Sequence, residues 1–263
     1  LPIPSLAGDW RAPEDFIGIH FFSPVEKMML VEVILGEKTG ERALAVALDF
    51  VRAIRKTPIV VNDSRGFYAN RCVTMYMLEA HLMLTEGVPA AMVETVARLA
   101  GMPVGPLALN DEVAVDLAWK ILQATKRDLG EQAVDPRQER LLGEMVVKRG
   151  RLGRKNGMGF YDYPDKGKKR LWPGLAEIVG PAKPAECFDI EELKARLLAT
   201  QALEAARCVA EGVVTDVREA DVGSILGFGF APYRGGTLSH VDGMGVKAFV
   251  DLCDRLAEKH GPR

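Results

Sequence analysis

The sequence predicts a mainly helical protein with a small α/β part at its N-terminal end. Two short apolar runs rich in Val, Ile and Phe, residues 16–22 and 29–35, predict strands in that part. From residue 67 onward the apolar residues recur at helical spacing instead. A set of charged residues and glycines in the helical part occurs twice, which indicates a duplicated helical unit.

The α/β part is expected to contain five elements. They are a helix over residues 6–10, strands over 16–22 and 29–35, an amphipathic helix over 40–56 and a last strand over 58–61. So small a set of strands leaves sheet edges and apolar faces that we expect to be exposed.

The helical part is expected to begin with helices over residues 69–86, 89–99, 113–129 and 139–148. Gly87 directly follows the first of these and is a typical helix stop. Residues 150–186 are rich in Gly, Lys and Pro, which predicts an ordered loop followed by a linker.

The duplication is visible as a set of residues that recurs at a nearly constant offset. Arg71, Glu79 and Glu86 recur 125 positions later as Arg196, Glu204 and Glu211, and Gly101 and Pro106 recur 126 positions later as Gly227 and Pro232. The second copy has Ala195 at the position of Asn70. We therefore expect the second copy to be structural rather than catalytic.

The composition excludes several classes of protein. A net charge of -2 gives no basic face for nucleic acid. No apolar run approaches the roughly 18 residues of a membrane span. The four cysteines are widely spaced, which predicts free thiols in a reducing compartment, hence a cytoplasmic protein without disulfides or a zinc site.

A histidine and a glutamate in the two predicted strands form the candidate site. Glu32 lies inside the run LVEVI, where a lone charge is costly to bury, so it is expected to be neutral or paired. His20, in the run GIHFFSP, is the nearest ionisable residue in a similar setting. A buried carboxylate that holds an imidazole makes a general base near neutral pH. The alternative is that His20 is a structural histidine at a strand end.

These two runs resemble the signature of L-3-hydroxyacyl-CoA dehydrogenases, in particular the branch formed by the alpha subunit of the bacterial fatty-acid beta-oxidation multienzyme complex. Four further motifs carry the resemblance: TPIVVND at 57–63, GFYANR at 66–71, PVGP at 103–106 and GRKNGMGFY at 153–161. The sequence departs from the family pattern at Ser23, where the family commonly has Asn, and at Arg65, where it commonly has Pro.

The resemblance implies a division of the chain into four parts. Residues 1–62 correspond to the last strands of a Rossmann-type NAD-binding domain, 63–164 to a helical dehydrogenase C-terminal domain, 165–186 to a linker and 187–263 to a second copy of the helical domain. In the multienzyme branch this duplication is understood to replace the dimer contact of the single-domain enzymes.

The dinucleotide fingerprint of the family is expected upstream of this sequence. The chain begins with Leu1 rather than Met, which we interpret as a fragment, and NAD is expected to bind mainly to the missing N-terminal domain. The only glycine-rich match, GMGVKA at 243–248, follows no clear strand and is interpreted as a helix-entry turn. No cofactor-binding residue is therefore assigned, and no metal is expected.

The reaction implied is NAD-dependent oxidation of L-3-hydroxyacyl-CoA to 3-oxoacyl-CoA in fatty-acid beta-oxidation. His20 would be the general base, and Glu32 would orient its ring. Asn70 would bind the substrate carbonyl or the reacting oxygen through its amide. From the residues alone, a helix cap is the favoured interpretation of Asn70, and the GFYANR match reverses that preference.

The implied partners are an acyl-CoA substrate and, as a candidate, a thiolase beta subunit; homo-oligomerisation is left open. A contact of the basic run 166–170 with CoA phosphates is less favoured than a solvated turn. Two alternatives remain. The chain could be a non-catalytic helical assembly fragment of the multienzyme subunit, or a 3-hydroxybutyryl-CoA dehydrogenase.

Overall fold

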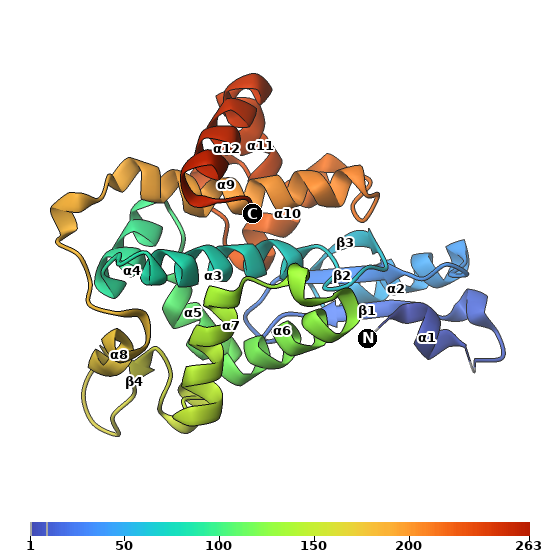
Figure 1. Ribbon diagram of the computed structural model, residues 1–263. Helices are drawn as coiled ribbons and strands as arrows, with labels where there is room; N and C mark the ends of the chain where they lie inside the picture. Colours follow the sequence, from blue (N-terminus) through green and yellow to red (C-terminus); the bar gives the residue numbers. More distant parts are fainter. Residues whose placement is uncertain (1, 9) are drawn as a thin grey trace. The chain divides into compact units, whose positions relative to one another are not determined.

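The structure is a computed structural model that describes residues 2–8 and 10–263. Figure 1 shows its helices and strands along the chain. These elements form two compact units. The first comprises the described residues up to Met75 together with Leu198–Arg263, and the second is Tyr76–Leu197. The elements are mostly helices with two small sheets, which confirms the predicted mainly helical architecture with an N-terminal α/β part.

The first unit is built on a three-stranded sheet with the order β1-β2-β3. β1 (Gly18–Phe21) runs antiparallel to β2 (Leu30–Leu35), and β2 runs parallel to β3 (Thr57–Asn62). The helix α2 (Glu41–Ala53) joins the two parallel strands, as a parallel pair requires a crossover connection. The register places His20 directly opposite Glu32.

The alternation of side chains along β2 produces two apolar layers. Val31 and Val33 face α2, where they pack with Ala47 and Val51. Leu30 and the other residues on the opposite face pack against the N-terminal end of α3 (Ala69–Thr85), the C-terminal end of α9 (Ile190–Ala210) and α10 (Val217–Phe228). Glu32 points to this second face and is fully buried there.

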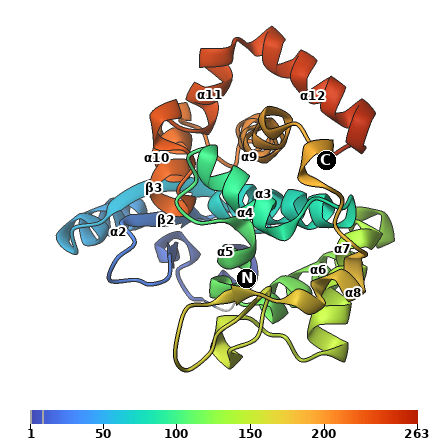
Figure 2. The ribbon, with the colours of Figure 1, turned by 90° about the vertical axis from the view of Figure 1, so that its left-hand side faces the viewer.

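The segment between α9 and α10 pairs with the end of β3, at one edge of this sheet, so that this part of the edge is not exposed as expected. Val61 of β3 forms an antiparallel bridge with Val214, and the Asn62 backbone donates to the Val213 carbonyl. The remaining helices of the unit are the short α1 (Ile3–Ala7), α11 (Thr237–Met244) and α12 (Val246–His260). Figure 2 shows α11 leading into α12 at the end of the chain.

The second unit is helical apart from one two-residue strand pair. Its elements are the rest of α3 and α9, α4 (Ala90–Leu99), α5 (Pro106–Val113), α6 (Val115–Leu129), α7 (Pro136–Gly143), β4 (Tyr161–Asp162), β5 (Arg170–Leu171) and α8 (Ala176–Val179). A buried carboxylate, Glu94, accepts the backbone N–H groups of Leu107 and Ala108 at the start of α5. At this helix a carboxylate from another element thus takes the place of a local cap.

Three predicted boundaries are wrong, each for a local reason. The helix expected over 6–10 runs from Ile3 to Ala7 because Pro4 suits a first helical turn; Asp9 lies outside the described residues. The helix expected over 113–129 is split at Ala114, whose φ of 93° ends α5. The helix expected from residue 139 starts at Pro136, since the Asp135 side chain caps it by accepting from the Arg137 N–H.

The segment expected to be loop and linker, 150–186, contains β4, β5 and α8. Arg151 organises its first half because its guanidinium donates to the Gly159 carbonyl at 2.7 Å and to the Asp162 carboxylate at 2.6 Å. The same guanidinium lies 4.1 Å from the centre of the Trp172 ring, a cation–π contact.

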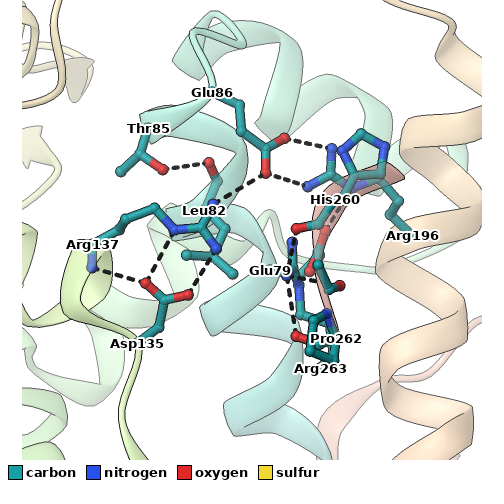
Figure 3. A network of polar contacts seen from close by, with 11 residues as sticks. Glu79, Leu82, Thr85, Glu86, Asp135, Arg137, Arg196, His260, Pro262 and Arg263 are labelled. Carbon is teal, nitrogen blue, oxygen red and sulfur yellow. Dashed lines mark hydrogen bonds and ion pairs between the residues drawn. The ribbon is translucent and has the colours of Figure 1, made fainter. Parts of the chain in front are cut away.

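Two arginine–glutamate clusters, one in each unit, follow the repeat seen in the sequence. In the second unit Arg196 donates from Nε to Glu79 and from both Nη atoms to Glu86 (Figure 3). In the first unit Arg71 donates from Nε to Glu204 and from both Nη atoms to Glu211. In both clusters the arginine Nε donates to the first glutamate of the repeat and the two Nη atoms donate to the second. The duplication itself stays a prediction.

Candidate functional site

The structure brings His20 and Glu32 into direct contact. The Nδ1 atom of His20 lies 2.6 Å from Oε2 of Glu32. The contact follows from the sheet, because residues opposite each other on antiparallel strands project from the same face. The pairing expected for the buried glutamate is therefore present.

The two side chains differ in their access to solvent. The His20 side chain is 28% exposed, whereas Glu32 is 0% exposed. Because a carboxylate only accepts, Nδ1 of His20 donates to it, and the lone pair of the imidazole lies on Nε2. The geometry thus combines a reachable proton acceptor with a carboxylate that holds the ring in one tautomer.

The second oxygen of Glu32 binds the beginning of α3. Oε1 accepts the backbone N–H of Tyr68 at 3.1 Å and that of Ala69 at 2.8 Å. N–H groups at a helix start have no intrahelical partner and carry partial positive charge, so they suit a buried carboxylate. Sequence reasoning missed these donors. The signal available was the position of GFYANR at a helix start.

Two aromatic rings enclose the His20 imidazole. The ring centre of Phe22 lies 4.7 Å from that of His20, and the ring centre of Phe67 lies 5.8 Å away. Phe67 has a φ of 51°, a left-handed conformation that is costly for a bulky residue. Such backbone strain persists where the surrounding structure imposes it, and it is concentrated at functional sites.

Asn70 is exposed and lies one residue inside α3. Asn70 does not occupy the N-cap position that the cap interpretation requires, because α3 begins one residue earlier, at Ala69. Among the described residues the Asn70 amide has no hydrogen-bond partner, and the hydrogen bonds of His20 and Glu32 go to other groups. Its role at the site stays a prediction.

The other histidines lie elsewhere. His81, in the second unit, is buried; burial lowers its pKa to about 4, and a hydrogen bond with Asn110 opposes the shift. His240 is buried in the first unit between the rings of Phe230 and Phe249, and burial lowers its pKa as well. Neither lies next to a carboxylate.

The glycine-rich run at 243–248 spans the end of α11 and the start of α12. It is a helix–helix junction and not the strand–helix turn of a dinucleotide site. Within the described residues no group of three His, Cys, Asp or Glu side chains could hold a metal ion. No helix in the described part of the chain is long and apolar enough to cross a bilayer.

Comparison with known proteins decides the family. Residues 1–64 match the family model "3-hydroxyacyl-CoA dehydrogenase, NAD binding domain", and residues 66–163 match "3-hydroxyacyl-CoA dehydrogenase, C-terminal domain". The chain belongs to the 3-hydroxyacyl-CoA dehydrogenase family. Within that family, its candidate site lies in the NAD-binding-domain match except for the N-terminal turn of α3, which lies in the C-terminal-domain match.

Named relatives agree with this assignment. The fatty acid oxidation complex subunit alpha of Shewanella loihica is 39% identical over 264 residues, which cover 100% of this chain and 37% of the relative. The (S)-3-hydroxybutyryl-CoA dehydrogenase of Ralstonia eutropha is 34% identical, with a TM-score of 0.56 over 63% of this chain and 58% of that one. The chain therefore spans about 37% of the length of its curated relatives.

A third comparison bears on the fold alone. The 3-hydroxybutyryl-CoA dehydrogenase of Escherichia coli K12 superposes with a TM-score of 0.80 at 21% identity, covering 100% of this chain and 71% of that one. The NAD-binding-domain match also corrects one expectation. NAD binding mainly by a missing domain is not supported, because residues 1–64 are themselves matched as that domain.

Proposed function

We propose that the chain carries the base of an NAD-dependent oxidation of L-3-hydroxyacyl-CoA to 3-oxoacyl-CoA in fatty-acid beta-oxidation. The observation that supports it most is the 2.6 Å contact between His20 and the buried Glu32, within a segment matched to this family. The relatives named as fatty acid oxidation complex subunits support the pathway.

The proton chemistry follows from the geometry. His20 takes the proton of the substrate hydroxyl on Nε2 while its Nδ1–H stays bonded to Glu32. The imidazolium that forms lies against a carboxylate, which stabilises it. Oε1 of Glu32 keeps its two backbone donors throughout, so the carboxylate does not need to move.

NAD, when bound, supplies the hydride acceptor. The described residues fit the part of its domain that carries the base, since β2, α2 and β3 form the parallel strand–helix–strand unit of such domains. They include no G-x-G-x-x-G turn between a strand and a helix, so no residue is assigned to its phosphates.

Asn70 is proposed to bind the substrate oxygen. It is exposed, it follows the two residues whose N–H groups hold Glu32, and its amide has no other partner among the described residues. A side-chain amide at a helix start can donate to a carbonyl or to developing negative charge.

The substrate class and the partners are proposed from the relatives' names. An acyl-CoA of the beta-oxidation series is the first candidate, and 3-hydroxybutyryl-CoA is the second, because a 34%-identical relative carries that name. A complex with a second subunit, a thiolase in the interpretation of the sequence, is proposed because the other relatives are complex subunits. A cytoplasmic location and homo-oligomerisation stay predictions.

The test is NADH oxidation with acetoacetyl-CoA, measured in the 263-residue chain and in the full-length gene product. His20→Ala in the full-length protein is expected to lower kcat about 10³-fold, since it removes the base. His260→Ala is the matched control, because His260 ends α12, and it should keep kcat.

Two outcomes would overturn the proposal. Near-normal turnover in His20→Ala would remove the base assignment. Absence of activity from both wild-type proteins, with both folded by circular dichroism, would favour the helical assembly module and leave His20 and Glu32 as structural residues.

A further inference from the structure

We propose that the hydroxyl groups of Tyr68 and Thr237 position the His20–Glu32 pair, although the hydrogen bonds described for these two residues go to partners other than His20. This inference rests on the proposed function. It assigns a role at the site to the C-terminal helices α10 and α11, which sequence reasoning considered purely structural.

The connection runs through a short series of hydrogen bonds. The Tyr68 hydroxyl donates to the Ala220 carbonyl at 2.8 Å and lies 3.0 Å from Oγ1 of Thr237. The backbone N–H of the same tyrosine binds Oε1 of Glu32, whose other oxygen binds His20. Tyr68 thus connects two parts of the unit: its hydroxyl binds α10 and α11, and its backbone N–H binds the carboxylate of Glu32.

Burial makes this connection rigid. Tyr68, Thr237 and Glu32 are each 0% exposed, so water cannot replace a lost hydrogen bond. The Thr237 backbone N–H in turn donates to Oγ of Ser224, which is also 0% exposed. The phenol is held from two helices at once.

Two glycines of α10 allow the close approach that this arrangement requires. A Cβ atom at Gly223 would lie 3.1 Å from Cε1 of Tyr68 and 2.7 Å from Cδ1 of Ile59. A Cβ atom at Gly227 would lie 2.6 Å from Cδ2 of Leu30. The helix backbone therefore lies directly on Tyr68 and on the strand that carries Glu32.

The strained residue next to Tyr68 explains why an anchor is needed. Phe67 holds a φ of 51°, and the N–H groups that bind Glu32 follow it immediately. A strained backbone relaxes unless its neighbours are fixed. With the phenol released, we expect the first turn of α3 to move away from Oε1 and the carboxylate to turn from His20.

The test compares Tyr68→Phe, Thr237→Val and Thr237→Ser in the 263-residue chain labelled with ¹⁵N-histidine. The readout is the downfield Nδ1–H proton of His20, together with its nitrogen shift. We expect this resonance to shift or broaden in Tyr68→Phe and in Thr237→Val. In Thr237→Ser it should stay as in the unchanged protein, because the hydroxyl remains. In the full-length protein, kcat should fall about 10-fold in Tyr68→Phe with KM for NADH unchanged.

Tyr76→Phe is the matched control. Tyr76 lies on α3, the helix that Tyr68 directly precedes. It is equally buried and donates its hydroxyl to the Val104 carbonyl, so the change removes the same atom away from the dyad. A His20 resonance identical to wild type in both Tyr68→Phe and Thr237→Val would overturn the proposal. So would an equal change in Tyr76→Phe, which would indicate general loosening.

The His20 resonance and kcat are measured independently of each other. Should Tyr68→Phe fail to fold, the Thr237→Val and Thr237→Ser pair decides the question by the same resonance. A changed resonance in a protein without dehydrogenase activity supports the positioning role and counts against the proposed function alone.

Discussion

His20 and His81 are both histidines with hydrogen bonds to neighbouring side chains, yet their surroundings differ in every respect that matters for catalysis. His20 faces a carboxylate and is 28% exposed. His81 is 1% exposed, and its two nitrogens face the side-chain amides of Asn110 at 2.9 Å and Gln138 at 3.1 Å. It also stacks on Phe160.

The comparison shows how the surroundings of the proposed base differ from those of a structural histidine. Neutral amides satisfy both nitrogens of His81 without stabilising a charge, and burial lowers its pKa to about 4. Glu32 binds one nitrogen of His20 and offsets the charge that protonation creates. The polar partner and the solvent access of the second ring nitrogen distinguish the two histidines, and the solvent access is visible only in the structure.

The largest effect on kcat is expected when the carboxylate of Glu32, the partner of His20, is replaced by an amide. Glu32→Gln keeps the shape, but its NH₂ group donates toward Nδ1 and forces the proton onto Nε2, where the base must accept. We expect kcat of the full-length protein to fall about 10³-fold, measured as NADH oxidation with acetoacetyl-CoA. Thermal unfolding of the same variant should show a folded protein.

The control for this change is Glu219→Gln, a second glutamate of the first unit that accepts a backbone N–H, that of Val60, and does not contact His20. It should keep kcat. Comparable losses in the two variants would show that the effect is structural and that Glu32 has no special relation to the base.

The reverse exchange gives His81 the partner that His20 has. Asn110→Asp puts a carboxylate at Nε2 of His81, and an adjacent negative charge favours the imidazolium. We expect the pKa of His81 to rise from about 4 to above its ordinary value of 6.5, followed by a ¹⁵N-histidine NMR titration. A pKa that stays near 4 would mean that burial outweighs the carboxylate, which contradicts the comparison.

The smallest effect is expected on the pH dependence of stability. Above pH 6.5 His81 is neutral in both states; between pH 6.5 and about 4 the unfolded chain binds a proton that the folded chain does not. As the pH is lowered through that window, the unfolding free energy should therefore fall by up to about 1.4 kcal/mol per pH unit. The unfolding free energy, measured by urea unfolding at pH 7, 6 and 5, should depend less steeply on pH in His81→Gln than in the unchanged protein. Equal slopes in the two proteins would contradict the assigned pKa.

Much of the chain's organisation was determined by its sequence alone. The runs around His20 and Glu32 predicted two strands because bounded apolar runs rich in Val, Ile and Phe suit buried strands, and β1 and β2 lie within them. The buried charge of Glu32 predicted a partner, since a lone carboxylate is too costly to bury. Helices α3 and α4 end where Gly87 and Gly101 follow, as glycine stop signals predict.

Only the tertiary structure decided how the site is held. Glu32 caps a helix 36 positions away, and Glu94 and Asp221 likewise accept N–H groups at the starts of α5 and α11. Capping patterns in a sequence are local, whereas N–H groups at a helix start can also be bound by a carboxylate from another element. The link from Thr237 through Tyr68 spans 169 positions. Such contacts depend on which faces meet after folding, and spacing along the chain does not encode that.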